Sequence, residues 1–443
     1  MIKTHSVTLD SDKCIGCTDC IKRCPTEAIR VRNSKAIITD DRCIDCGMCI
    51  RVCNQNAKKA ITDPFEVIYQ YKYKIAIPAP TLYTQFKNTI DPNMILTALK
   101  SMGFDDVLEV ARGAEIVSEY TRRFIESHDI KKPIISSACP AIVKLIQIRF
   151  PSLINNILPI ISPKEAIARY AKKLMMEQGY KEEEIGVFFI SPCAAKVTNS
   201  RYPQVVEKSY VDGVISIKGI YKDLLEHLGN IVEPEALLTS TKYGIGWASI
   251  GGEGKATRID DYIAVDGIEN VIKVLEKMEN GKLDVDFIEC LACTNGCLGG
   301  PLTVENSFVA NNRMIKIKNN IAGDILRRTL PLNHIKVSLD WNFELPPKQV
   351  LKLDGNIVRA LEKMEKMETI FETLPQIDCG SCGAPTCRAL AEDIARGEAN
   401  IEDCVFMLRQ KVRYMAEEMV TLAQRLPTSI QKPKEKSDGK REY

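Results

Sequence analysis

The chain has 443 residues, of which 45% are hydrophobic and 27% charged, so several soluble domains with large cores are expected. The formal net charge is only +2 and no basic stripe is interleaved with aromatic residues, which argues against a nucleic-acid-binding protein. Because neither a signal-peptide core nor eighteen consecutive apolar residues occurs, we expect a cytoplasmic protein without a membrane span. Seventeen reduced cysteines in such a chain are better candidates for metal thiolates than for disulfides.

Residues 1–63 carry two cysteine runs of equal spacing, which predict an α+β bacterial-type ferredoxin domain with two four-iron clusters. In this pattern the fourth cysteine of each run binds the other cluster. The first cluster is assigned to Cys14, Cys17, Cys20 and Cys53, and the second to Cys43, Cys46, Cys49 and Cys24. Paired zinc sites are the alternative, and Pro25 after the first run favours iron, although the second run ends in Asn54.

Residues 64–340 alternate short apolar runs with segments of helical spacing. Residues 75–77, 134–135 and 187–190 read as buried strands, and 161–178 reads as a helix, which predicts an α/β domain. Three cysteine motifs follow such strands on loops, where a rigid sheet can hold ligands. The motifs are Ser136–Pro140, Ser191–Lys196 and Glu289–Gly300.

These motifs, in this order, resemble the active-site loops of the diiron (iron-only) hydrogenases. The resemblance implies a catalytic domain of two lobes around a buried H-cluster. In that cofactor a four-iron cubane is bridged by Cys297 to a diiron unit with CO and cyanide ligands. It also implies that the chain interconverts protons, electrons and dihydrogen. The cubane ligands implied by position are Cys139, Cys193, Cys293 and Cys297.

Two more features resemble the pocket of the diiron unit. The segment Ala79-Pro80-Thr81 is similar to the family's loop beside the diatomic ligands, and Lys196 matches a lysine that hydrogen-bonds an iron-bound cyanide. A lysine there would face an anionic cluster, whose charge helps keep it protonated despite burial. Most lysines face solvent instead, but the position after Cys193 favours the pocket.

Other positions depart from the family pattern. Ala138 stands where the prototypical enzymes have a proton-relaying cysteine, and a methyl group cannot carry a proton. Lys164, Ser191, Asn199 and Leu291 also replace the usual residues. Since such neighbours tune potential and proton supply, the pattern resembles the sensory branch of the family and favours a slow hydrogen sensor.

Three residues are candidates for the missing relay. Cys290 is the only cysteine left without a cluster, and Glu289 and Glu253 are nearby carboxylates. A buried cysteine is most often inert packing, so the relay interpretation of Cys290 competes with a plain structural one.

The C-terminal quarter is expected to hold a linker, a small iron-sulfur module and a helix. The linker, 341–378, contains an amphipathic helix over 356–374 whose apolar face should pack on a neighbour. That face is formed by Ile357, Leu361, Met364, Ile370 and Phe371. The module, 379–404, resembles a four-iron unit of corrinoid iron-sulfur proteins and sensory hydrogenases, with zinc as the alternative. Its ligands are Cys379, Cys382, Cys387 and Cys404.

Residues 405–426 have the apolar spacing of a coiled coil, formed by Leu408, Val412, Met415, Met419, Leu422 and Leu426. The helix could lie on its own domain, or it could pair two chains as a homodimer or bind a partner's helix. Residues 427–443 are polar and are expected to form a disordered tail.

The expected partners are dihydrogen and protons as substrates and a ferredoxin-like redox partner or a signalling protein. Two rival functions stay open. One is a non-catalytic iron-sulfur scaffold or electron carrier that keeps only the four-iron clusters, and the other is a subunit of a larger redox complex.

Overall fold

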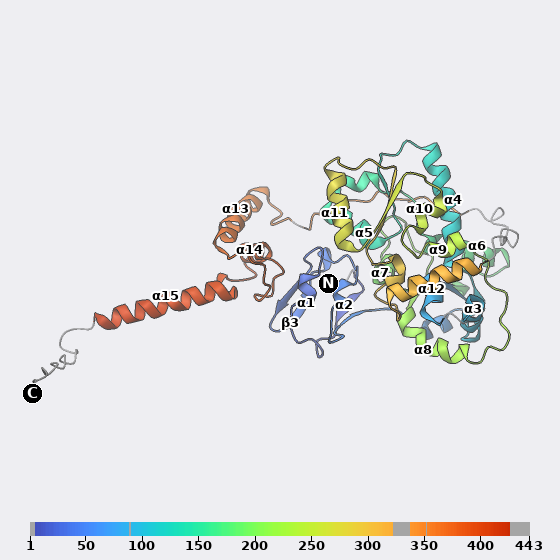
Figure 1. The fold of residues 1–443 in the computed structure, drawn as a ribbon, viewed down its shortest axis with the longest axis horizontal. Coiled ribbons are helices and arrows are strands. Elements are labelled where there is room, and N and C mark those ends of the chain that lie inside the picture. Colours follow the sequence, from blue (N-terminus) through green and yellow to red (C-terminus); the bar gives the residue numbers. More distant parts are fainter. Residues whose placement is uncertain (1–4, 88–89, 322–336, 351, 426–443) are drawn as a thin grey trace, which may run out of the picture. The chain divides into compact units, whose positions relative to one another are not determined.

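The computed structural model describes residues 5–87, 90–321, 337–350 and 352–425. The chain divides into two compact units, Met1–Leu351 and Lys352–Tyr443. The first unit holds a small N-terminal fold and two parallel sheets, and the second consists of helices (Figure 1). No helix in the described ranges is long and apolar enough to cross a membrane.

The N-terminal part is an α+β fold in which two antiparallel strand pairs flank short helices. Strand β1 pairs with β4 and β2 pairs with β3. The elements are β1 (Val7–Leu9), α1 (Asp19–Lys22), β2 (Ile29–Arg32), β3 (Lys35–Ile38), η1 (Asp40–Arg42), α2 (Met48–Arg51) and β4 (Lys58–Ala60). Four-residue helices are not stable alone in water, so α1 and α2 depend on their packing and on what their cysteines bind.

The first lobe of the following α/β domain is built on a parallel sheet with strand order β6-β5-β8-β9. Its strands are β5 (Tyr73–Pro78), β6 (Asp106–Val107), β8 (Ile185–Ser191) and β9 (Gly213–Ser216). All seven residues of β8 are buried, because both faces of the sheet are covered. A strand covered on both faces has a continuous apolar run rather than an alternating one, which is the pattern that the sequence shows.

The second lobe is built on a three-stranded parallel sheet with the order β10-β11-β7. Its strands are β7 (Ile134–Ile135), β10 (Tyr262–Asp266) and β11 (Phe287–Leu291). Helices surround the two sheets. The longer ones are α3 (Pro92–Ser101), α4 (Val110–Ser127), α5 (Pro140–Arg149), α6 (Pro163–Glu177), α7 (Ala194–Arg201), α8 (Ile217–Leu228), α11 (Ile268–Glu279) and α12 (Ser307–Asn320). The short ones are η2 (Phe65–Gln70), η3 (Pro80–Gln85), η4 (Pro151–Asn156), η5 (Glu182–Glu184), α9 (Lys242–Gly246), α10 (Gly252–Thr257) and η6 (Gly296–Gly299).

The predicted motif loops all leave the carboxyl ends of parallel strands. They follow β5, β7, β8 and β11, two strands from each sheet. In open α/β sheets this edge is where ligands bind, because loops from neighbouring strands converge there. The predicted fold class is therefore confirmed: an α/β domain with two lobes follows an α+β ferredoxin-like part.

The second unit contains α13 (Ile357–Thr373), α14 (Cys387–Arg396), η8 (Ile401–Asp403) and α15 (Val405–Gln424). Helix α13 packs on α14 through a stripe formed by Met367, Ile370, Phe371 and Leu374. The predicted face was therefore wrong at its start, since Ile357, Leu361 and Met364 are exposed. The ten residues of α14 span only about 15 Å and cannot cover the seventeen of α13, which span about 25 Å. Because α13 belongs to this unit, residues 352–378 are part of the C-terminal unit and not of the linker predicted over 341–378.

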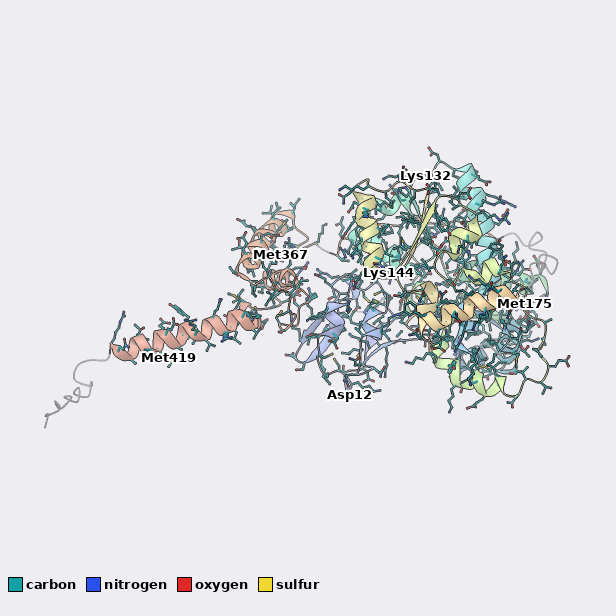
Figure 2. The ribbon with its side chains drawn as sticks, in the orientation of Figure 1. Asp12, Lys132, Lys144, Met175, Met367 and Met419 are labelled. Atoms are coloured by element: carbon teal, nitrogen blue, oxygen red, sulfur yellow. The ribbon has the colours of Figure 1, made fainter. Side chains whose placement is uncertain are left out.

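Helix α15 is exposed along its length except at Met407 in its first turn, which packs against the small core of this unit. Its apolar side chains project to solvent, and Met419 is an example (Figure 2). Beyond the first turn, this contradicts the interpretation in which the helix lies on its own domain. Leu426 and the predicted tail, 427–443, lie outside the described residues.

Candidate active site

Four cysteines from three loops meet between the two lobes. Cys139 caps α5 after β7, and Cys193 caps α7 after β8. Cys293 and Cys297 follow β11. Burial raises the pKa of Cys193 far above its ordinary value, and the charges of the other three thiolates raise it further. Thiols in such a site ionise only with a cation beside them, which fits a set of iron ligands.

Gly300 allows the loop after β11 to pack against the loop after β8. A Cβ atom on Gly300 would lie 2.1 Å from the carbonyl oxygen of Pro192, so a larger residue would push the loops apart. The same carbonyl accepts a hydrogen bond from the backbone N–H of Leu302 at 3.0 Å. The glycine after the cysteine motif therefore fixes Cys297 relative to Cys193.

Lys196 lies inside this cysteine cluster. Its Nζ is 3.4 Å from Sγ of Cys297. Burial alone would lower the pKa of Lys196, but the charges of Cys297, Cys193 and Cys139 outweigh it and raise the pKa above the usual lysine value. The side chain is therefore a buried cation directed at the thiolates, the position that the sequence predicted.

A cavity of about 580 Å³, counted with its solvent-open part, adjoins Cys297 and Lys196. One wall is formed by Ala79, Pro80 and Thr81, which follow β5. The hydroxyl oxygen of Thr81 is buried and has no hydrogen-bond partner among the described residues. A buried polar atom left unsatisfied costs about 1–3 kcal/mol, so the cavity is suited to a bound group with hydrogen-bonding capacity.

The opposite wall is acidic. Oγ of Ser136 donates to Oε2 of Glu253 at 2.5 Å and accepts from the backbone N–H of Ala138 at 3.2 Å. Glu289 accepts hydrogen bonds from the backbone N–H groups of Gly251 and Gly254 at 2.9 and 3.0 Å. Both carboxylates are buried and line the cavity.

The two carboxyl groups can hold a proton near neutral pH. Burial, and then the charge of Glu289, raises the pKa of Glu253 well above its usual range. Burial also raises the pKa of Glu289, while its backbone hydrogen bonds oppose that rise. Ala138 lines the same cavity, but its methyl group has no exchangeable proton.

Cys290 does not join this group. Successive side chains of a strand point to opposite faces, so Glu289 and Leu291 face the cavity while Cys290 faces away from it. The Cys290 side chain is completely buried in the apolar core of the second lobe. The structure thus brings two of the three relay candidates, Glu289 and Glu253, to the cavity.

Lys164 is a second buried lysine at the cavity, and the sequence indicated it only as a departure. It is 2% exposed, and its Nζ lies 3.7 Å from Oε2 of Glu165. Burial lowers its pKa, the charge of Glu165 opposes this, and the cation of Lys196 adds to the lowering. Ser191, another departure, stabilises the ligand loop, because its Oγ accepts from the Cys193 N–H at 3.1 Å. Asn199 lies outside this cavity.

The ferredoxin-like part gathers its eight cysteines into two separate sites. One depression is lined by Cys14, Cys17, Cys20 and Cys53. The other is lined by Cys24, Cys43, Cys46 and Cys49. Each set contains the fourth cysteine of the other run, which is the arrangement predicted from the spacing.

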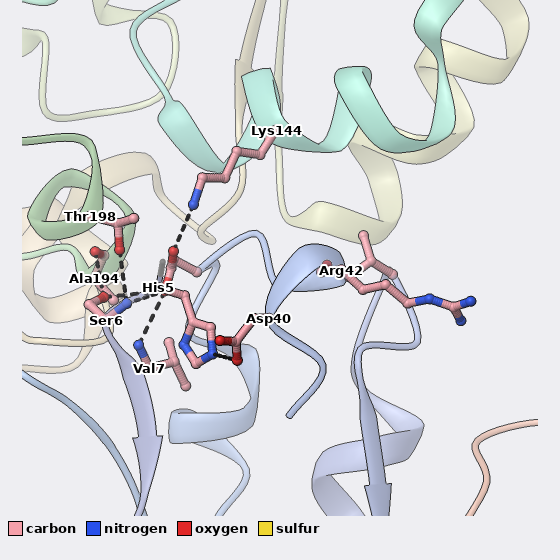
Figure 3. A network of polar contacts seen from close by, with 10 residues as sticks. His5, Ser6, Val7, Asp40, Arg42, Lys144, Ala194 and Thr198 are labelled. Carbon is pink, nitrogen blue, oxygen red and sulfur yellow. Dashed lines mark hydrogen bonds and ion pairs between the residues drawn. The ribbon is translucent and has the colours of Figure 1, made fainter. Parts of the chain in front are cut away.

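A buried polar network joins the ferredoxin-like part to the active-site loops (Figure 3). Asp45, next to Cys46, accepts from Lys144 Nζ at 2.9 Å and from the Ser6 N–H at 2.9 Å. Oγ of Ser6 donates to the carbonyl oxygen of Ala194 at 2.8 Å, one residue after Cys193. The sequence did not reveal this network, because its partners come from distant segments with no motif in common.

Comparison with known proteins identifies the family. Residues 72–229 and 248–301 match the family described as iron only hydrogenase large subunit, C-terminal domain. The match includes the four cysteines and Lys196. The domain over residues 72–301 therefore belongs to the iron-only hydrogenase family.

The chain is 25% identical over 362 residues to the periplasmic Fe hydrogenase large subunit of Nitratidesulfovibrio vulgaris, covering 67% of this chain and 86% of that one. It is 23% identical over 372 residues to iron hydrogenase 1 of Clostridium pasteurianum, covering 67% of this chain and 65% of that relative. The chain therefore spans just under two thirds of the second relative. A solved apo FeFe-hydrogenase from Chlamydomonas reinhardtii aligns at 15% identity with a TM-score of 0.47, covering 58% and 88% of the two chains.

Two further family matches place iron-sulfur regions on both sides of this domain in the sequence. Residues 6–54 match a 4Fe-4S dicluster domain, and residues 374–406 match an Fe-S cluster family. In the second region Cys387 and Cys404 are buried in one small core with partly buried Cys382. Burial raises the pKa of Cys382, and the charges of Cys379 and Cys404 add to that effect. These matches support iron over zinc at both predicted sites.

Proposed function

We propose that the chain is a slow, sensory hydrogenase that interconverts protons, electrons and dihydrogen at the cavity beside Cys297. The observation that carries this proposal is the union of four cysteines, a buried cation and an unsatisfied hydroxyl around one cavity. A scaffold that held only a four-iron cluster would need the cysteines but neither Lys196 nor the orphaned Thr81 oxygen.

The residues fit an H-cluster. Cys139, Cys193, Cys293 and Cys297 would hold it, and its diiron unit would supply the hydrogen chemistry when bound. Lys196 would donate to an anionic cyanide, and the Thr81 hydroxyl would donate to a diatomic ligand. The cavity gives these donors fixed positions in a site of low polarity, where electrostatic interactions are strong.

Protons would reach the cavity through Glu253 rather than through a thiol. The hydrogen bond from Ser136 holds the Glu253 carboxyl, and the raised pKa allows it to gain and lose a proton near neutral pH. Glu289 stands next along the wall. Tyr262 packs on Gly254, and burial and the charge of Glu289 raise its pKa. Because Tyr262 is partly exposed, the proton route would reach solvent there.

Electrons would pass through the two ferredoxin-type clusters. They would come from a ferredoxin-like partner or leave to a signalling protein. The loop with the second cluster's ligands packs directly on the active-site loop, since a Cβ atom on Gly47 would lie 2.5 Å from the Pro301 side chain. The C-terminal four-iron cluster would be a further redox site. A cytoplasmic location stays a prediction from the sequence.

Isotope exchange tests the proposed activity. Protein matured with its diiron unit and incubated with dihydrogen in deuterium oxide should form HD, detected by mass spectrometry, and Cys297→Ala should form none. Matured protein with a full complement of iron that releases no HD would contradict the enzyme and favour the non-catalytic scaffold.

A further inference from the structure

We propose that α15 pairs antiparallel with α15 of a second copy of this chain. The inference rests on the exposed face of this helix and on its charges, and it does not depend on catalytic activity. Helix α15 begins directly after Cys404, its cap, and runs to Gln424.

The apolar seam of α15 is regular and uncovered. Its members recur at alternating steps of three and four residues, the spacing of positions a and d in a coiled coil. They are Val405, Leu408, Val412, Met415, Met419 and Leu422. Each side chain is 45–69% exposed, so the described residues of the C-terminal unit provide no core for them. A continuous apolar stripe of this length on a soluble helix marks an interaction surface.

The charges beside the seam select the partner and its direction. With Val412 at position a, the flanking g positions are Lys411 and Glu418. In an antiparallel pair the residue Val412 meets Met415 of the second copy, and g positions face g positions. Lys411 then faces Glu418 of the second copy, and the twofold symmetry makes the contact twice.

Other arrangements lose these contacts. In a parallel pair the g positions face e positions, so Lys411 and Glu418 would meet Ala416 and Ala423. An antiparallel pair shifted by one heptad would set Glu418 against Glu418 and Lys411 against Arg425. Exposed ion pairs contribute only about 0.2–1 kcal/mol each, so they orient the pair while the seam supplies most of the affinity.

The pairing has a consequence for the iron-sulfur module. Because each α15 starts at Cys404, an antiparallel pair holds the two Cys404 positions at opposite ends of a helix about 30 Å long. A parallel pair would place them side by side. In the single chain Lys411 forms an exposed ion pair with Glu402. In the dimer Lys411 would contact Glu418 of the second copy instead of Glu402.

Charge reversal in the full chain tests the proposal. Sedimentation equilibrium should show a dimer for the intact protein and a monomer for Met415→Glu, which places a charge in the seam. Lys411→Glu and Glu418→Lys should each weaken self-association about tenfold, because each turns two attractive contacts into two repulsive ones. An equimolar mixture of the two variants should form a heterodimer at least as tight as the original dimer.

Glu417→Lys is the matched control, since the residue lies opposite the seam and should leave the dimer unchanged. An intact chain that stays monomeric would overturn the proposal. A dimer that neither single reversal weakens, or a mixture no tighter than the separate variants, would also overturn it.

Discussion

The two walls of the active-site cavity are built in different ways. On one side, here called the ligand wall, Cys297 and Lys196 line the cavity, and they and the other three cysteines come from short motifs. On the proton wall, Ser136 and Glu253 form a hydrogen bond although they are 117 residues apart. The first wall keeps the cysteines and the lysine of the family pattern, and the second departs from that pattern at Ala138. In the proposed function, holding the cofactor and supplying protons are therefore separable, and variants should affect one without the other.

The largest effect is expected on the ligand wall. Lys196→Met should reduce hydrogen turnover by about 10³-fold, because a preorganised donor to the anionic site is lost. It should also lower the occupancy of the diiron unit, measured by infrared spectroscopy and iron content. Lys222→Met, which alters a lysine on the surface of α8, is the control and should change neither quantity. Full occupancy of the diiron unit and unchanged turnover in Lys196→Met would show that the lysine has no role at the site.

On the proton wall, Glu253→Gln should slow turnover by about 10²-fold with unchanged cluster content, since the amide cannot relay a proton. In the original protein the carboxyl group loses its proton as pH rises through the raised pKa. Hydrogen evolution should therefore fall over that range and hydrogen oxidation should rise. The variant should lack this pH dependence, measured as turnover against pH in both directions. Glu226→Gln on the surface is the control, and an unchanged profile in Glu253→Gln would exclude the route.

The contrast between the walls also explains what the sequence could predict. Cysteine spacing is local, so it predicted the two cysteine sets of the ferredoxin-like part, while the resemblance of three short motifs to a known family predicted the cysteines beside the cavity. The Ser136–Glu253 contact depends on how two remote loops meet, so no local sequence pattern predicts it. Strand alternation could have separated Glu289 from Cys290, because neighbouring residues of β11 face opposite sides.

The packing of helix α13 also depends on a remote segment that its own sequence does not reveal. The helix and its amphipathic character followed from the sequence, but the buried stripe begins only at Met367. Which turns of the helix are covered depends on the length of its neighbour α14, which a periodic pattern in α13 does not contain. The exposed Ile357 and Leu361 show the limit of that pattern.

A smaller effect, a gain in turnover, is expected from adding a thiol at Ala138. Ala138→Cys places a thiol at the cavity next to the loop of Ser136 and should raise turnover about tenfold at constant cluster content. The gain should be partial because Glu253 already serves the site. Ala141→Cys, buried in α5 within the core of the second lobe, is the control for an added thiol. Equal turnover in Ala138→Cys and the original protein would show that proton delivery is not limiting.

The smallest effect on turnover is expected for Cys290→Ser. The residue packs in the apolar core away from the cavity, so turnover and its pH dependence should stay within about twofold. Burying the hydroxyl without a partner should instead lower the free energy of unfolding by about 1–3 kcal/mol, measured by denaturant titration. A slowed reaction at unchanged stability would return Cys290 to the proton route.

The central claim is that the ligand wall holds a diiron unit. Infrared spectroscopy of the matured protein tests it most directly, because iron-bound CO and cyanide absorb where the polypeptide does not. CO and cyanide bands should appear in the original protein, shift or disappear in Lys196→Met and remain in Glu253→Gln. Matured protein that contains all its four-iron clusters but shows no such bands would contradict it.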